Sequence, residues 1–553
     1  MMERLLVRGD LAARTVVVVV FPELSVGHLG RFNRVSDRRL WRFLGVAVVA
    51  ALFAAPAAYS ATSRGSAATG SLLGCDTGHP AEAFYSDGAI AATSDSVVPC
   101  AVATGYGAAE SQIQVAPNGT LYVTPAMTTQ PGLGYVDPGA VGGVNPTGTA
   151  VPSRQEAGAN ASGMAVSTDN GATWTFSKIA GRKFSCCDDN LYIDPVSGRL
   201  FYSNIYGTAD PSPLPPGPTA TLPGMESAVM SASYPGYQQW NGPTLMAGTL
   251  AENPHFTSAP APAGQAKAPS AGRMSYWCAD GPGPQPEQRV CYRSFDGGAS
   301  WLPASDFAAS CSQASGVGGV GPYPQGGPDG SLWAACGTNL LRSSDEASTW
   351  PVVATLPVSV STNSLRVDGA GNLYLLTASG RDEDLRISTD HGKTWKGPFN
   401  MTPPEVRAGT RNIDTGIQWP FSVGYRPGEV TFSFLLDHRS DGGSDAYIVA
   451  AHQLMNSRGA VTSNPVFYSA MINPASRPMI GGGSSGIGSA NDFFGNTIGP
   501  DGTAWTAFYS DCLKDNSGNY TDPSCKAAGG KTYVNATSSR PAEEMTVGSL
   551  RWL

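Results

Sequence analysis

Apolar and polar residues alternate over short runs in this chain, and turns rich in Gly, Pro, Asn or Asp separate the runs. Alternation with a period of two predicts half-buried β-strands, and two such runs around a Gly-containing turn predict a β-hairpin. Clear hairpins of this kind lie at 113–123, 191–202, 365–376 and 497–508, and weaker copies lie at 328–335 and 421–434. The pattern therefore predicts an all-β protein built from six repeated hairpins.

A second repeat lies between the hairpins. Octets of the form Ser-x-Asp-x-Gly-x-Thr/Ser-Trp begin at Ser167, Ser294, Ser343 and Ser388. In such a turn the Ser and Asp side chains bond nearby backbone N–H groups, the Gly tolerates positive φ, and the Trp buries apolar area as the next strand begins. The last three copies are spaced by about 45 to 50 residues, the size of one four-stranded propeller blade. The third copy has Ala347 in place of the Gly, which predicts a distorted turn there.

These octets resemble the Asp-box, or BNR repeat, of sialidase-like β-propellers. The resemblance and the six hairpins together imply a six-bladed propeller. In that family the box joins the third and fourth strands of a blade, on the face away from the ligand site. The strand at 545–552 either completes the sixth blade or pairs into the first blade and closes the ring.

Long insertions are expected at about 124–163, 203–289 and 509–535 within a single propeller domain that spans 61–553. As connections between second and third strands, they would all lie on the face opposite the boxes. Loops gathered on one face of a rigid scaffold are expected to carry function. The alternative is that these Pro-, Gly- and Ser-rich stretches are loose surface loops.

Residues 1–60 are predicted to be a leader. Basic residues at 31–42 precede an apolar run at 43–58, and small residues follow at 58–60, as in a secretory signal cleaved near Ser60. All ten Cys lie beyond this leader, which agrees with export to an oxidising compartment. Short loops favour the pairs Cys75/Cys100, Cys278/Cys291, Cys311/Cys336 and Cys512/Cys525, while the adjacent Cys186 and Cys187 either bond each other or pair elsewhere. We expect a secreted or cell-surface protein that meets a membrane only if the leader is retained as an anchor.

The charge pattern argues against nucleic acid as a partner, because the formal net charge is −8 and no basic run interleaved with aromatics follows residue 64. We expect a monomer without a cofactor. A structural calcium ion could bind one of two acidic clusters, although neither has EF-hand spacing: Asp437, Asp441 and Asp445, and Asp511, Asp515 and Asp522.

The residues just before each innermost strand are expected to point into the mouth of the central channel. Asp188 and Asp189, which follow the Cys pair, and Asp492 occupy such positions, and the end of the last hairpin adds Tyr509 and Asp511. Crowded carboxylates raise one another's pKa toward the range of a general acid, or recruit a cation. The alternative is that each Asp caps a turn or is solvated.

The resemblance further implies sialidase chemistry, with a Tyr nucleophile activated by Glu, an Asp acid/base and three Arg that grip the sugar carboxylate. Tyr509 sits roughly where the family places its nucleophile, and Arg411 with Asn412 is similar to an Arg-Asn pair of a triad arginine. The family's Phe/Tyr-Arg-Ile-Pro motif is absent, and no Arg lies between Arg64 and Arg154.

We therefore expect a glycoside hydrolase or divergent exo-sialidase-like enzyme that acts on extracellular glycans. Its candidate catalytic residues are Asp188, Asp189, Asp492, Tyr509, Asp511 and Arg411. The alternatives are a non-catalytic carbohydrate- or protein-binding propeller and a purely structural cell-surface propeller.

Overall fold

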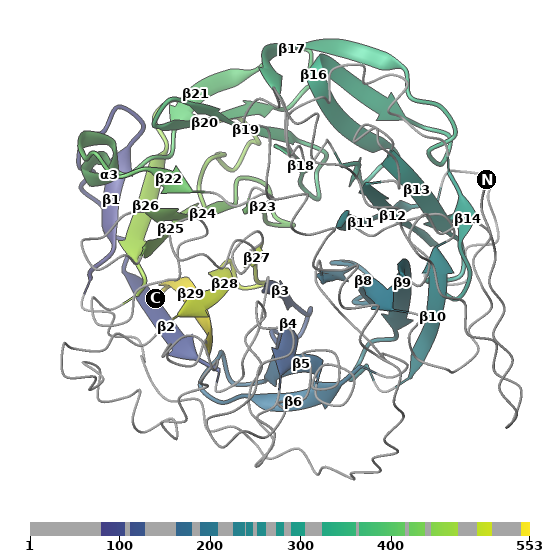
Figure 1. Cartoon of the computed structure of the whole chain (residues 1–553). Coiled ribbons are helices and arrows are strands. Elements are labelled where there is room, and N and C mark those ends of the chain that lie inside the picture. Colours follow the sequence, from purple (N-terminus) through teal and green to yellow (C-terminus); the bar gives the residue numbers. More distant parts are fainter. Residues whose placement is uncertain are drawn as a thin grey trace, which may run out of the picture.

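The computed structural model describes residues 79–104, 111–127, 162–179, 189–207, 225–237, 239–246, 252–261, 272–280, 289–304, 323–360, 364–414, 420–436, 444–473, 495–510 and 544–553. Their strands form seven antiparallel sheets arranged around a central axis (Figure 1). The protein is therefore an all-β propeller, and the prediction of six blades is wrong by one.

The first four blades follow the order of the chain, each from its innermost strand outward. Blade 1 contains β3 (Gln112–Val115), β4 (Leu121–Met127), β5 (Ser162–Ser167) and β6 (Thr175–Lys178). Blade 2 contains β7 (Asn190–Ile193), β8 (Leu200–Gly207), β9 (Met225–Ala232) and β10 (Trp240–Met246). Blade 3 contains β11 (Glu252–Pro260), β12 (Arg273–Asp280), β13 (Arg289–Ser294) and β14 (Leu302–Pro303). Blade 4 contains β15 (Gln325–Gly326), β16 (Leu332–Ser343) and β17 (Val352–Val360).

Of the last three blades, blades 6 and 7 each include one strand from the N-terminal part of the chain. Blade 5 contains β18 (Leu365–Val367), β19 (Leu373–Ser379), β20 (Asp382–Ser388) and β21 (Lys396–Asn400), followed by the short helix α3 (Pro404–Ala408). Blade 6 contains β22 (Ile413–Asp414), β23 (Phe421–Val423), β24 (Val430–Leu436), β25 (Asp445–Ala451), β26 (Val466–Met471) and β1 (Glu82–Tyr85). Blade 7 contains β27 (Gly495–Ile498), β28 (Ala504–Ser510), β29 (Glu544–Trp552) and β2 (Val97–Ala103).

The ring is closed by strands from both ends of the described chain. The C-terminal strand β29 stays in blade 7, where it pairs on one side with β28 and on the other with β2. Strand β1 adds an outer edge to blade 6 by pairing with β26. At the axis, β27 contacts β3. Blade 7 thus combines segments from distant parts of the sequence, an arrangement that leaves few free sheet edges.

The core is divided among the interfaces between blades. The described buried residues form seven apolar clusters, and each cluster joins two neighbouring blades. The cluster between blades 2 and 3, for example, packs Phe201 and Val229 against Phe256 and Trp277. Burial at every interface makes each blade depend on its neighbours, as expected for a structure of radially repeated sheets.

The sequence analysis missed one blade because four strands, β9 to β12, lie inside the stretch 203–289, which was assigned to an insertion. Strands β9 and β10 complete blade 2, and β11 to β14 form blade 3. The corner between β9 and β10 has the length of an Asp box, from Ser233 to Trp240, but carries Pro235 and Tyr237 at the Asp and Gly positions. Gly236 and Tyr237 have φ of 85° and 47°, like Asn170 and Gly171 of the first box at 57° and 82°. These two residues repeat the pair of positive φ values of an Asp box without its sequence.

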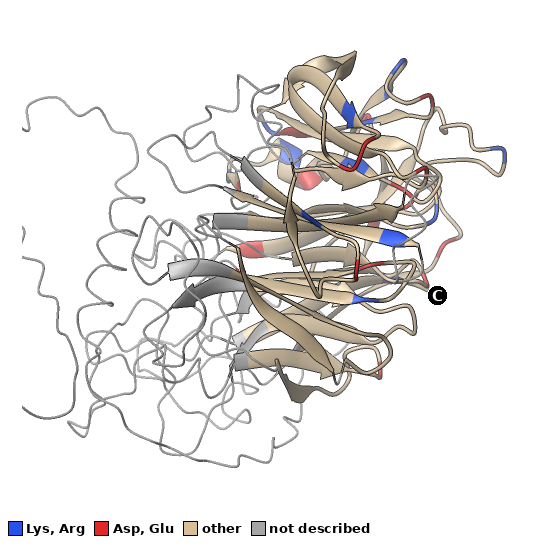
Figure 2. Ribbon diagram, turned by 90° about the vertical axis from the view of Figure 1, so that its right-hand side faces the viewer, with Lys and Arg blue, Asp and Glu red and all other residues tan. Residues whose placement is uncertain are grey.

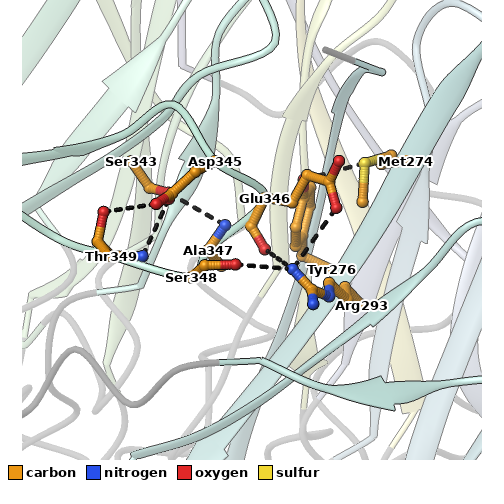
Figure 3. Close-up of polar contacts among 9 residues, drawn as sticks. All are labelled: Met274, Tyr276, Arg293, Ser343, Asp345, Glu346, Ala347, Ser348 and Thr349. Carbon is orange, nitrogen blue, oxygen red and sulfur yellow. Dashed lines mark hydrogen bonds and ion pairs between the residues drawn. The ribbon is translucent and has the colours of Figure 1, made fainter. Parts of the chain in front are cut away.

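The four recognisable boxes share one set of hydrogen bonds. In the third box, Ser343 Oγ donates to Asp345 and accepts from the Ala347 N–H, while Thr349 donates to Asp345 through its N–H and hydroxyl (Figure 3). Ala347 adopts φ 61° there. The predicted distortion of this turn is therefore wrong, because the third box keeps the bonds of the others despite its Cβ atom.

The fourth residue of a box also binds the preceding blade. Arg293 of blade 3 donates to the Glu346 carbonyl oxygen at 2.8 Å and to Ser348 Oγ at 3.0 Å (Figure 3). Equivalent bonds run from Ser231 to the Gly297 carbonyl at 2.8 Å and from Arg551 to the Asn170 carbonyl at 2.6 Å. The boxes thus connect blades as well as strands.

Antiparallel order places the turns between first and second strands on the same face as the boxes, which we call the box face. The C-terminus marks this face in Figure 2, since Arg551 bonds the first box, and many of the described charged residues lie on that side. The strand ends that flank 128–161 and 511–543 lie at the opposite face.

One predicted disulfide is confirmed. Cys278 and Cys291 lie opposite each other on β12 and β13 and are bonded. Cys100 and Cys336 are also disulfide-bonded, and their predicted partners Cys75 and Cys311 lie outside the described residues, as do Cys186, Cys187, Cys512 and Cys525. Within the described ranges, no helix is long and apolar enough to cross a membrane.

Candidate functional site

A cavity of about 590 Å³ lies on the propeller axis. Its lining comes from all seven blades, through the innermost strands β3, β7, β11, β15, β18, β23 and β27 and the turns that follow them (Figure 1). We call it the axial cavity. Its volume falls within the range of small-molecule sites in proteins.

The innermost strands contribute both to the clusters between blades and to the cavity wall. Ile113, Leu191 and Phe421 belong to the clusters, and the polar residues Gln112, Asn190 and Ser422 beside them line the cavity. The uncharged polar groups among the cavity residues are amides, hydroxyls and one imidazole, including those of Gln112, Gln114, Asn190, Tyr192, His255, Thr257, Gln325, Ser422 and Thr497. The lining also includes five charged residues, Arg273, Arg366, Asp368, Arg426 and Glu429. The wall is therefore rich in hydrogen-bonding groups, most of them uncharged.

His255 stays neutral in this wall. Burial lowers its pKa to about 3, and the nearby Arg366 guanidinium acts in the same direction. Its ring stacks on Tyr323 with centroids 4.9 Å apart, and its Nε2 lies 3.0 Å from the Gln325 amide nitrogen. Because an amide nitrogen only donates, His255 Nε2 accepts, which leaves Nδ1 to carry the proton.

Arg366 adds a positive charge to the wall. Burial lowers its pKa to about 10, so the guanidinium remains charged at neutral pH. It donates to the Leu365 carbonyl oxygen at 2.8 Å and lies over the Phe421 ring at 5.7 Å from the centroid. Both contacts hold the long side chain in a defined position.

Two ion pairs lie at the cavity near the box face. Arg273 bonds Asp194 at 2.6 Å and also donates to Ser258 at 2.9 Å. Arg426 bonds Glu429 at 2.5 Å. Burial raises the pKa of Glu429, although the Arg426 guanidinium acts in the opposite direction.

The predicted catalytic residues do not form one site among the described residues. Asp188, Asp492 and Asp511 lie outside the described residues. Asp189 is 3% exposed and accepts a hydrogen bond of 2.5 Å from the Tyr202 hydroxyl, directly before Asn190 of the cavity wall. Tyr509 lies in β28 opposite Met545.

Arg411 is placed away from the axial cavity. Its guanidinium bonds Asp445 at 2.5 Å and donates to the Leu436 carbonyl oxygen, so it ties together the ends of β24 and β25 in blade 6. Asp445 also accepts from the Asn473 amide at 3.3 Å. These contacts describe a structural clamp.

The model of the BNR/Asp-box repeat matches residues 386–396, which contain the whole fourth box. The same turn recurs in blades 1, 3, 4 and 5 of a ring of sheets. The protein is a β-propeller that carries BNR/Asp-box repeats. This combination of repeat and ring supports the resemblance to sialidase-like propellers.

Solved structures similar to this BNR-repeat propeller are remote. They include TolB from Acinetobacter baumannii (12% identity, TM-score 0.32, 57% of this chain and 60% of that chain), the GH74 xyloglucanase from Xanthomonas campestris (13%, 0.35, 69% and 52%) and the phage phi92 endosialidase (12%, 0.33, 83% and 69%). The chain spans less than two thirds of the first two. No curated protein sequence matches the chain.

Sequence reasoning missed most of the cavity wall of this BNR-repeat propeller. The sequence analysis expected the residue just before each innermost strand to face the channel. The cavity is lined instead by residues within these strands, such as Gln114, Tyr192, Arg366 and Thr497. The signal was present, because most of the hairpins had been located and their innermost strands line the cavity. No group of three or more potential metal ligands occurs among the described residues, and Asp445 is the one member of the two acidic clusters that falls within them.

Proposed function

We propose that this protein is a secreted carbohydrate-binding β-propeller whose axial cavity holds part of a glycan. The observation that carries the proposal is the composition of the cavity wall, where amides and hydroxyls from different blades converge on one space of about 590 Å³. Sugars present many hydroxyl groups that both donate and accept, and carboxamides and hydroxyls match them in both roles. The Cys278–Cys291 disulfide agrees with an extracellular setting.

Binding of neutral oligosaccharides tests the proposal. Isothermal titration calorimetry of the full chain with maltohexaose, cellohexaose and xylohexaose should show binding of at least one of them. Gln114→Ala and Thr497→Ala remove wall groups and should each weaken that binding about fivefold, the loss expected for one hydrogen bond.

Thr355→Ala is the matched control, because Thr355 is exposed on the outer strand β17. Its affinity should equal that of the unmodified protein. Absence of binding to any glycan, or equal affinity in all variants, would show that the cavity is not a carbohydrate site.

Glycoside hydrolysis is the second candidate function, because Asp189 directly precedes the cavity residue Asn190. Release of 4-methylumbelliferone from a panel of glycosides, including the sialoside, tests it, with Asp189→Asn as the control. Turnover that this substitution abolishes would favour the hydrolase. The hydrogen bond that Asp189 accepts from the Tyr202 hydroxyl argues instead for a structural role of this carboxylate.

A further inference from the structure

The axial cavity reaches the box face through a rim of apolar residues. The turns after the innermost strands contribute the exposed rim residues Pro117, Pro195, Val196, Pro328, Tyr425 and Pro500. Val196 is 50% exposed and Tyr425 is 56% exposed, so both large side chains present apolar surface beside the cavity. We call this set the rim. Apolar side chains gathered at the edge of a polar cavity are typical of a binding site.

Tyr425 is held in position by the neighbouring blade. The Gly369 N–H of blade 5 donates to the Tyr425 carbonyl oxygen at 3.0 Å. A Cβ atom on Gly369 would lie 2.9 Å from Tyr425 Cε2 and 3.0 Å from its Cδ2. The ring therefore packs over the bare backbone of Gly369, which only glycine permits. Since the side chain remains more than half exposed, it offers a fixed aromatic surface at the rim.

The charged groups near the rim favour a neutral ligand. Arg426 beside Tyr425 bonds Glu429 at 2.5 Å, and Arg273 bonds Asp194 at 2.6 Å. An acidic ligand would compete with these carboxylates for the guanidinium groups, whereas a neutral ligand leaves the pairs intact. Below the rim, Gln114 and Thr497 supply an amide and a hydroxyl.

We propose that a neutral glycan enters the axial cavity from the box face, with one hexopyranose stacked on Tyr425. The apolar C–H face of the sugar packs on the Tyr425 ring and the neighbouring rim, and its hydroxyls bond the wall. The proposal rests on the proposed function and adds the face of entry, the ligand class and the residue that orients it. It places the ligand on the face opposite to the site implied by the family resemblance.

Titration calorimetry with the same three neutral hexaoses, and with 3′-sialyllactose as an acidic comparator, tests this proposal. Tyr425→Ala should weaken neutral binding about tenfold or more, while Tyr425→Phe keeps the ring and should bind like the unmodified protein. Gly369→Ala should weaken binding several-fold without touching the sugar, because its methyl group displaces the ring. Thermal midpoints of every variant show whether the fold is kept.

Two valines give a matched pair of variants. Val196→Ala removes methyl groups at the rim, and Val352→Ala removes the same groups from β17, at 50% and 53% exposure. Only Val196→Ala should lower affinity.

The outcomes separate the two proposals. If a neutral hexaose binds and Gln114→Ala weakens it, but Tyr425→Ala and Val196→Ala do not, entry from the box face is overturned and the glycan-binding function stands. If only 3′-sialyllactose binds, the neutral ligand class is overturned. If no glycan binds the unmodified protein, both proposals fail.

Discussion

The carboxyl group of Glu383 provides a quantitative test of the packing between blades 5 and 6. Glu383 lies on β20, is 4% exposed, and faces the same side of the strand as Leu385 and Ile387, which belong to the apolar cluster of this interface. No described residue donates a hydrogen bond to its Oε2. Burial, with smaller effects from Asp384 and Asp382, raises its pKa from 4.5 to about 8.

This raised pKa makes stability fall as the pH rises. Between pH 4.5 and about 8 the unfolded chain has lost a proton that the folded chain still holds, so alkali favours unfolding. At pH 7 the loss in free energy of unfolding is on the order of 3 kcal/mol. It follows from about 1.4 kcal/mol for each pH unit between the pKa of the unfolded chain and pH 7. Glu383→Gln keeps the shape and removes the titration, so its gain in stability over the unmodified protein should grow by about this amount from pH 4.5 to 7.

Urea denaturation of both proteins at half-unit steps from pH 4.5 to 9 measures this difference. Asp390→Asn is the control, and its difference from the unmodified protein should stay constant over this range. Hydrogen bonds from Thr394 lower the pKa of Asp390 to about 2, so its contribution is complete above pH 4 and is lost as the pH falls toward 2. A Glu383→Gln difference that stays constant between pH 5 and 8 would refute the reasoning.

Three further tests use substitutions at a box turn, at a bond between blades and at the disulfide, each followed by thermal or urea denaturation. Gly298→Ala should lower the free energy of unfolding more than Gly171→Ala. Both residues have positive φ, but only the methyl group at 298 would approach Ser231, with its Oγ at 2.7 Å. Equal losses would contradict this. Arg293→Met should cost about 1–2 kcal/mol through lost bonds to the next box, and a neutral result would show that the bond between blades contributes nothing. Replacing Cys278 and Cys291 by Ala should cost about 3 kcal/mol by the entropy of the closed loop, and an unchanged midpoint would contradict that.

The fold class was predictable because the Asp box makes its own local contacts. Ser388, Asp390 and Thr394 are bonded within one turn, so the chemistry that fixes the turn is written in contiguous residues. The number of blades was not predictable in the same way. Tyr237 reaches positive φ without a Gly, and its hydroxyl bonds the Gly198 carbonyl at 2.6 Å, so the corner of blade 2 is held by a contact distant in sequence.

The closure of the ring was beyond sequence reasoning for a related reason. Strand β2 pairs with β29 across almost the whole length of the chain, from Val97 beside Trp552 to Ala103 beside Thr546. Nothing in the alternation of Val97–Ala103 names its partner, because period two specifies which face is buried and not which strand lies alongside.

The seventh blade also changes how the site must be understood. A ring of identical blades widens at its axis with each blade added, so seven innermost strands leave a space that their own side chains do not fill. The side chains beside the axial carboxylates therefore need not be as crowded as they would be in a narrower ring of six blades. Here the wall carries amides and hydroxyls, and Asp194 and Glu429 are bonded to Arg273 and Arg426. Burial and the nearby Asp501 carboxylate still raise the pKa of Glu429, so one acid of the cavity wall keeps the perturbation expected there, beside uncharged groups suited to binding.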